Sequence, residues 1–220
     1  NALLATKISF MNDVANLCER LGADVNDVRV GVGTDGRIGP QFLFPGVGYG
    51  GSCFPKDLRA IVRMGREAGC PMRVVEAVEA VNQDQKQVLF HKIHAHFGGS
   101  LSGRRIAIWG LAFKPRTDDM REASALVVIE KLLAAGARVR AYDPEAMDRA
   151  RTMLDDRVEL ATSPYLALEG AEALAILTEW KEFGNPDFDQ MRSQMAAPVV
   201  MDGRNIYEPR QLAEAGFTYY

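Results

Sequence analysis

The sequence predicts an α/β protein in which an all-helical domain precedes a domain built on a parallel sheet. Before Phe97, apolar residues recur with the period of amphipathic helices, as at Leu4, Ile8 and Met11. After the glycine- and serine-rich stretch from Phe97 to Gly103, short apolar runs alternate with helical segments. Continuous apolar strands alternating with helices are typical of a parallel sheet covered on both faces. The second part is therefore predicted to be Rossmann-like.

The helices of the first part follow from their apolar spacing and their end signals. The first runs from Asn1 to Gly22, and Gly22 is a typical C-cap. Because Asn1 is not preceded by an initiator methionine or an approach segment, we expect this chain to be a piece of a longer protein. Further helices are predicted over about Asn26 to Val32, Pro55 to Glu67 and Met72 to His96.

The strands of the second part are short runs rich in β-branched and apolar residues. A helix is predicted over Glu122 to Ala135, closed by Gly136. The predicted domains are residues 1–97 and 98–220, because the glycine-rich stretch at Phe97 marks a boundary. The predicted strands are Arg104–Gly110, Ala137–Asp143, Ala173–Trp180 and Pro198–Gly203.

Composition excludes several classes of protein. The net charge of −3 offers no basic excess for nucleic acid or for an anionic membrane surface. No apolar run approaches the roughly 20 residues of a membrane helix, and no signal peptide opens the chain. The 3 cysteines indicate a reducing cytoplasm rather than a disulfide framework. No metal site is expected, because His91, His94 and His96 do not share one helix face.

The pattern G-x-G-x-x-G occurs in Gly31–Gly36 and in Gly46–Gly51. It indicates dinucleotide binding only between a strand and a helix. The first copy is followed by Gly39-Pro40, which forbids a helix there, and the stretch QFLF before the second is a poor strand, so neither is interpreted as a fingerprint. The predicted strand ending at Gly110 opens onto a loop with a single glycine, which can still present backbone N–H groups and Lys114 to a phosphate.

Cys53 stands at the predicted start of a helix, since Pro55 fits the first helical turn. The helix N-terminus favours an anion, and therefore the nucleophilic thiolate form of Cys53. Asp57 lies one helical turn on, where a carboxylate can position a water or move a proton. From composition alone a buried structural cysteine is an equal alternative for Cys53. It is the preferred interpretation for Cys18 and Cys70.

Three stretches in order, GYGGSCFPKD, IWGLAFKPRTDDMREASALVVIEKLL and DGRNIY, resemble the UDP-glucose/GDP-mannose dehydrogenase family, in particular its UDP-glucose 6-dehydrogenase branch. The resemblance covers essentially the whole chain. It implies oxidation of the sugar C6 alcohol of UDP-glucose to a carboxylate with two NAD⁺, through a cysteine thiohemiacetal and thioester. Related enzymes that act on N-acetylated sugars usually carry a histidine where this chain has Ser52.

The resemblance also implies roles for individual residues. Cys53 matches the nucleophile, Asp57 the aspartate that helps activate water, and Asn1 an asparagine that holds the oxyanion with a lysine upstream of this chain. Lys56 and Arg121 match residues that contact NAD. The matches to substrate-binding residues are Arg37, Phe44, Gly46, Gly48, Tyr49, Gly50, Phe113, Lys114 and Arg204.

The family's N-terminal NAD-binding domain has no counterpart in this sequence, so we expect the fragment alone not to transfer hydride. The family dimerises through its central helices, which implies a homodimer here. The alternatives that remain open are a GDP-mannose 6-dehydrogenase, a non-catalytic nucleotide-sugar-binding or dimerisation module, and a thiol-redox protein. The last is disfavoured because no second cysteine lies near Cys53 in the sequence.

Overall fold

The computed structural model describes residues 1–220, which form two compact units, residues 1–86 and 87–220. The dividing point lies within helix α4 (Arg73–His96) rather than after it, where the sequence predicted a boundary. The end of α4 packs with unit 2. Ile93 is fully buried there, and the ammonium of Lys131 lies 5.5 Å from the ring centre of Phe90.

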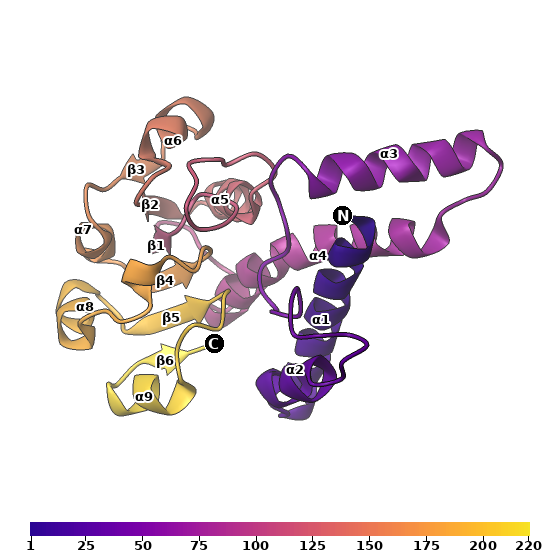
Figure 1. The fold of residues 1–220 in the computed structure, drawn as a ribbon. Helices are drawn as coiled ribbons and strands as arrows, with labels where there is room; N and C mark the ends of the chain where they lie inside the picture. Colours follow the sequence, from indigo (N-terminus) through magenta and orange to yellow (C-terminus); the bar gives the residue numbers. More distant parts are fainter. The chain divides into compact units, whose positions relative to one another are not determined.

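Unit 1 is all-helical, as predicted, and its ribbon is the indigo-to-magenta part of Figure 1. The first helix ends at Gly22, which adopts the left-handed conformation with φ 68°. The core joins helices and loop through the side chains of Ala5, Leu58, Val62, Val75 and Val78, together with Tyr49. Besides the first part of α4, the helices are α1 (Ala2–Leu21), α2 (Val25–Gly33) and α3 (Phe54–Glu67).

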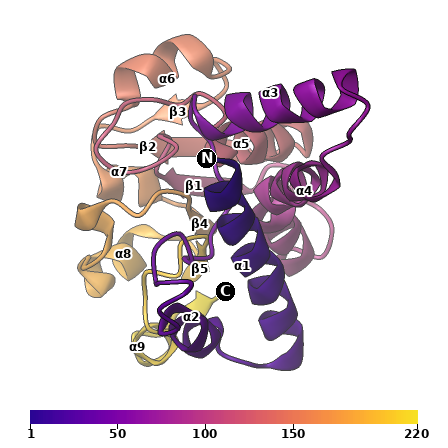
Figure 2. The same cartoon turned by 45° about the vertical axis from the view of Figure 1, so that its right-hand side comes forward.

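Unit 2 contains a single parallel sheet with helices on both sides; in Figures 1 and 2, α5 lies on the opposite side of the sheet from α7 and α8. The strands are β1 (Arg105–Trp109), β2 (Arg138–Tyr142), β3 (Glu159–Leu160), β4 (Ala173–Ile176), β5 (Val199–Asp202) and β6 (Thr218–Tyr219). The helices are α5 (Ser124–Ala134), α6 (Met147–Met153), α7 (Pro164–Leu168), the 3₁₀ turn η1 (Lys181–Phe183), α8 (Phe188–Gln194) and α9 (Pro209–Glu214).

The strand order is β3-β2-β1-β4-β5-β6, and every neighbouring pair is parallel. This is the order of the doubly wound Rossmann sheet, which confirms the predicted fold class. In such a sheet ligands bind beyond the carboxyl ends of the strands, at the point where the order reverses. Here that point lies between β1 and β4.

The centre of the sheet is apolar because both of its faces are covered. Every residue of β4 is buried, as are the last four of β1. Trp109 of β1 stacks on Phe183 with ring centres 4.9 Å apart, and its indole N–H donates to the carbonyl of Pro164 at 2.9 Å. The predicted strand Ala173–Trp180 ends early, at Ile176, and the chain continues through buried Leu177 and Thr178 to the 3₁₀ turn η1.

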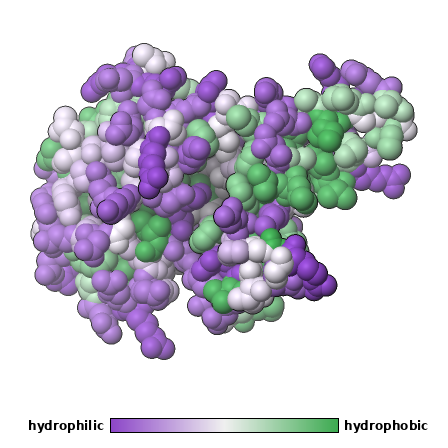
Figure 3. All heavy atoms as spheres, in the orientation of Figure 1, coloured by the Kyte–Doolittle hydropathy of each residue, from purple (hydrophilic) through white to green (hydrophobic).

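None of the helices combines the length and the apolar character that crossing a bilayer requires. Exposed apolar side chains occur on unit 1, and Figure 3 shows apolar atoms gathered over α3 and the start of α4, the helices that carry exposed Met64 and Val74. On α1 the exposed apolar side chains are Leu3, Phe10, Leu17 and Leu21.

Candidate functional site

Cys53 is exposed at the N-terminus of α3, where it is the N-cap residue. Phe54 is the first helical residue and Pro55 the second, so Pro55 lies within the first turn as expected. The carbonyl of Cys53 accepts the N–H of Asp57 at 2.9 Å, while its sulfur caps nothing. The Sγ atom is 3.7 Å from the hydroxyl of Ser52. The thiol is thus accessible beside the unpaired N–H groups of a helix end.

Asp57 collects the polar groups around this helix end. The side-chain amide of Asn1 donates a hydrogen bond to its Oδ2, and the ammonium of Lys56 lies 3.3 Å from its Oδ1. The bond from Asn1 is the main cause that lowers the pKa of Asp57, and the bond from Lys56 is the second. Asp57 is therefore a carboxylate at neutral pH. The structure brings Asn1 and Lys56 into contact with Asp57, which lies one helical turn from Cys53.

The other cysteines differ from each other. Cys18 is buried in α1, in agreement with a structural role. Cys70 is exposed after α3, so the prediction that it is buried is wrong: α3 ends at Glu67 and the chain turns through Gly69 at the surface. All three thiols are free. The structure gathers no group of three or more His, Cys, Asp or Glu side chains that could hold a metal ion.

The glycine loop, residues 45–51, leads into Cys53, and all of its residues are buried except for the partly exposed Gly46 and Gly48. Gly48 has φ 92°, a conformation that favours glycine. Tyr49 turns its ring into the core of unit 1, and burial raises the pKa of its hydroxyl to about 12. Gly46, Gly48 and Gly50 carry no side chain, and both peptide groups of Gly46 already bond to the side chains of Asn12 and Gln85. Their contacts with a substrate stay a prediction.

Two other candidate substrate residues of unit 1 are exposed. Phe44 is 59% exposed, and the guanidinium of Arg29 lies 4.6 Å from its ring centre. Arg37 forms an ion pair with Asp35 at 2.5 Å and is otherwise open to solvent. Arg37 therefore points away from the core, as a residue that reaches a ligand or another chain must.

In unit 2, the candidate residues lie beyond the carboxyl ends of the strands. Phe113 and Lys114 follow β1, and Arg204 follows β5, so all three lie beyond the carboxyl ends of strands. The ammonium of Lys114 lies 5.3 Å from the ring centre of Phe113 and is exposed. The family resemblance assigned these three residues to substrate binding, and the topology brings them to the carboxyl ends of the strands.

Arg204 is held by a residue that the sequence analysis missed. Its guanidinium Nη2 lies 2.6 Å from Oε1 of Glu179, which follows β4. The pair leaves Nε of Arg204 and Oε2 of Glu179 buried without a protein partner. Unpaired buried polar atoms of opposite character are typical of a site that a polar ligand or water completes.

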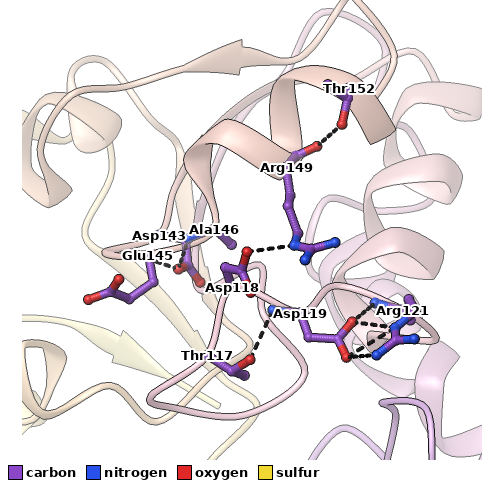
Figure 4. Close-up of polar contacts among 9 residues, drawn as sticks. All are labelled: Thr117, Asp118, Asp119, Arg121, Asp143, Glu145, Ala146, Arg149 and Thr152. Atoms are coloured by element: carbon purple, nitrogen blue, oxygen red, sulfur yellow. Dashed lines mark hydrogen bonds and ion pairs between the residues drawn. The ribbon is translucent and has the colours of Figure 1, made fainter.

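Arg121 lies in the long loop between β1 and α5. Its guanidinium makes a two-point contact with Asp119, with Nη2 to Oδ2 at 2.7 Å and Nε to Oδ1 at 2.9 Å. Figure 4 shows this pair and the neighbouring bond from Arg149 of α6 to Asp118, at 2.6 Å. Both ion pairs brace the loop. Arg121 remains exposed, so a contact with a cofactor stays a prediction.

Asp143 supports the same loop through hydrogen bonds, and the sequence analysis did not identify it. It is fully buried at the end of β2, and its two oxygens accept five hydrogen bonds. The donors are the N–H groups of Leu111 and Ala112, the indole of Trp180, and the N–H groups of Glu145 and Ala146. Figure 4 shows the last two of these contacts. The available signal was an acidic residue directly after an apolar strand.

The described residues do not form a dinucleotide fingerprint. After β1 the chain makes a loop from Gly110 to Ala123 before α5, so no helix N-terminus meets a pyrophosphate there. The acid at the end of β2, which a dinucleotide site needs for the ribose, is Asp143, and its oxygens are occupied internally. In unit 1, Gly31–Gly33 lie in α2 and Gly46–Gly51 follow no strand.

Comparison with known proteins assigns two parts of the chain to two domains of one family. Residues 1–84 match the central domain of the UDP-glucose/GDP-mannose dehydrogenase family, and residues 107–209 match its UDP binding domain. A UDP-glucose 6-dehydrogenase of Pseudomonas aeruginosa is 51% identical over the whole of this chain, which covers 49% of that protein. A UDP-glucose 6-dehydrogenase of Rhizobium meliloti is 49% identical, and this chain covers 50% of it.

A solved structure is similar over most of the chain. The UDP-glucose dehydrogenase of Pyrobaculum islandicum superimposes with a TM-score of 0.88 at 40% identity, over 96% of this chain and 47% of that one. The chain thus spans about half the length of the relatives that it matches. With two successive domains of one family in the expected order, the chain belongs to the UDP-glucose/GDP-mannose dehydrogenase family.

Proposed function

We propose that this chain supplies the thiol nucleophile and the UDP-sugar site of an enzyme that oxidises UDP-glucose to UDP-glucuronate with NAD. The observation that carries the proposal is the exposed Cys53 at the start of α3, with the ionised Asp57 one turn away. The names of the relatives supply the substrate. The three free cysteines suit a reducing cytoplasm, where the enzyme would act.

The chemistry assigned to this chain consists of bond formation and cleavage at sulfur. The thiolate of Cys53 adds to the C6 aldehyde, a C–S bond forms, and the carbonyl oxygen becomes an alkoxide that the amide of Asn1 can stabilise. After oxidation of this adduct to a thioester, water attacks the acyl carbon. Asp57 accepts a proton from that water, the C–S bond breaks, and the thiolate is restored.

NAD is the acceptor for the two hydrides in this proposal, but the described residues do not fit a complete site for it. The fingerprint geometry is missing, and Asp143 is occupied. We therefore assign to Lys56 of unit 1 and to Arg121 of unit 2 one contact each with NAD and no complete site. Both are exposed cations beside carboxylates, Asp57 and Asp119 respectively.

The nucleotide is assigned to the carboxyl ends of the strands of unit 2. Lys114 and Arg204 offer cations for a diphosphate, and Phe113 offers a ring for a base. Glu179 holds Arg204 in place for this contact. GDP-mannose is the rival substrate.

The test is the alkylation of the three thiols by iodoacetamide, followed by mass spectrometry of the peptides. Cys53 and Cys70 are both exposed and are expected to react, while buried Cys18 is expected to lag. UDP-glucose should slow the reaction of Cys53 alone. At about ten times its dissociation constant, the protection approaches about tenfold.

Cys70 is the internal control, since it is an exposed thiol of the same unit. Protection of Cys53 by GDP-mannose and not by UDP-glucose would replace the substrate. Equal rates at Cys53 with and without either sugar nucleotide, at concentrations that saturate binding, would contradict a role for this thiol in the reaction.

We also propose that the chain forms a homodimer through α1. Leu3, Phe10 and Leu17 are spaced by seven residues and Leu21 follows by four, which places these four exposed side chains along one face. Leu17→Glu is expected to convert a dimer into a monomer, because it places a charge in an apolar contact. Sedimentation equilibrium measures the change.

The matched control is Leu166→Glu, which charges an exposed leucine of α7 in unit 2. It is expected to leave the dimer intact. A wild-type chain that sediments as a monomer at micromolar concentration would rule out the proposed dimer.

A further inference from the structure

Three buried amide side chains of unit 1 face the glycine loop, and no role has been assigned to them so far. Asn12 of α1 is fully buried, and Asn82 and Gln85 of α4 are 2% and 7% exposed. Asn82 and Gln85 stand four and seven residues after the core residue Val78, at positions where an apolar side chain is expected. A buried amide is costly unless its hydrogen bonds are made. Asn82 and Gln85 and the carbonyl oxygen of Asn12 therefore need polar partners, while Nδ2 of Asn12 is buried without a partner.

Their partner is the backbone of the loop. The N–H of Tyr49 donates to Oδ1 of Asn82 at 2.8 Å, and Nδ2 of Asn82 donates to the carbonyl of Tyr49 at 3.1 Å. The N–H of Gly46 donates to Oδ1 of Asn12 at 2.8 Å, and Nε2 of Gln85 donates to the carbonyl of Gly46 at 2.7 Å. The N–H and the carbonyl of Gly46 and of Tyr49 are thus all hydrogen-bonded to side chains of α1 and α4. We call these three residues the amide clamp.

Between the clamped residues the loop lies directly against α4. A Cβ atom on Gly48 would be 2.9 Å from Oδ1 of Asn82 and 3.3 Å from its carbonyl oxygen. Only a residue without a side chain allows this approach. The two clamped points therefore fix the path of the loop as well as its ends.

The distance along the chain from the clamp to the sulfur is short. Gly50, Gly51 and Ser52 are all that separate Tyr49 from Cys53. Glycines impose little conformation of their own, so these residues cannot define a position for Cys53 unless the chain before them is fixed. The bonds of Asn82 to Tyr49 supply that fixed point from one side, and α3 supplies it from the other.

We infer that the amide clamp, with Asn82 at its centre, fixes the path of the glycine loop so that the thiol of Cys53 is held where it meets the sugar. This inference rests on the proposed function, because it assumes that Cys53 faces a sugar nucleotide. The three amides are positioning residues, since they act through the loop and need not touch the ligand. A loop that is ordered before binding spares the ligand the cost of ordering it.

The variant that tests the clamp is Asn82→Ala, which removes both bonds to Tyr49. It is expected to weaken the protection of Cys53 by UDP-glucose about tenfold, because the loop must then be ordered on binding. Alkylation of Cys70 in the same sample should be unchanged. Gln85→Met keeps the size of the side chain and removes the donor to Gly46 together with the acceptor for Asn16. It should act in the same direction and serves if Asn82→Ala does not fold.

The matched control is Ser9→Ala. The hydroxyl of Ser9 is buried in α1 and donates to the carbonyl of Val78 in α4 at 3.1 Å, so it joins the same helices without touching the loop. A purely structural role predicts that Ser9→Ala and Asn82→Ala lower the melting temperature and leave protection of Cys53 unchanged. The clamp predicts that only Asn82→Ala changes the protection.

Hydrogen exchange separates the failure of this inference from the failure of the proposed function. The amides of Gly46 and Tyr49 should be protected in the wild type, and that of Tyr49 should exchange faster in Asn82→Ala. If UDP-glucose does not protect Cys53 in the wild type, the proposed function fails, while exchange still decides whether the loop is clamped. Wild-type exchange and wild-type protection in Asn82→Ala would overturn the clamp.

Discussion

Replacing Asp143 with alanine is expected to cost unit 2 at least about 4 kcal/mol, a large fraction of the stability of an ordinary domain. The substitution removes the acceptor of five buried donors, among them the N–H groups of Leu111 and Ala112 and the indole of Trp180. Each unsatisfied buried donor costs about 1–3 kcal/mol, and part of this is recovered where the loop opens to water. Urea unfolding followed by circular dichroism measures the change.

The control for Asp143→Ala is Asp148→Ala. Asp148 is an exposed carboxylate of α6, close in sequence, and it forms only a surface ion pair with Arg151. Its removal should change the stability by no more than about 0.5 kcal/mol. If Asp143→Ala unfolds within about 1 kcal/mol of the wild type, the five contacts do not support the loop as described.

Gly110→Ala is the second substitution with a large expected effect, about 3–5 kcal/mol of unfolding free energy from combined strain and overpacking. Gly110 has φ 94°, and a Cβ atom there would lie 2.5 Å from Cβ and 2.6 Å from the backbone nitrogen of Thr178. A backbone atom cannot rotate away, so β1 and β4 would have to separate at the carboxyl edge. Thermal unfolding measures the loss, and calorimetric titration with UDP should show weakened binding.

Gly103→Ala separates backbone strain from the clash. Gly103 has φ 75° with nothing within 4 Å of a built Cβ, so it carries only the conformational cost, about 1 kcal/mol. Similar losses for Gly103→Ala and Gly110→Ala would show that Thr178 yields and that the close approach is unimportant.

Periodicity predicted the fold because its signals are local. The helices α1, α3 and α4 begin and end within two residues of their predicted bounds, since Gly22, Pro55 and the apolar spacing act over one or two turns. The short elements β3, α7 and β6 were not predicted. They have two to five residues and depend on contacts with the sheet rather than on their own pattern.

The candidate site was predicted in part for the same reason. Cys53 and Asp57 are four residues apart on one helix, so their proximity can be read from the sequence. The bond between Asn1 and Asp57 and the ion pair between Glu179 and Arg204 join residues far apart in the chain. Spacing alone cannot indicate such contacts, because they depend on how the helices and strands pack. The resemblance named Arg204 but gave no sign of Glu179.

The buried carboxylate at the end of β2 also limits what can be grafted onto this sheet. The strand order is that of coenzyme-binding proteins, so a glycine fingerprint after β1 is an obvious design for converting the sheet into a dinucleotide site. In such a design the side chain of Asp143 would have to break its hydrogen bonds with the N–H groups of Leu111 and Ala112 in order to reach a ribose. A successful design would first need a substitute acceptor for those amides.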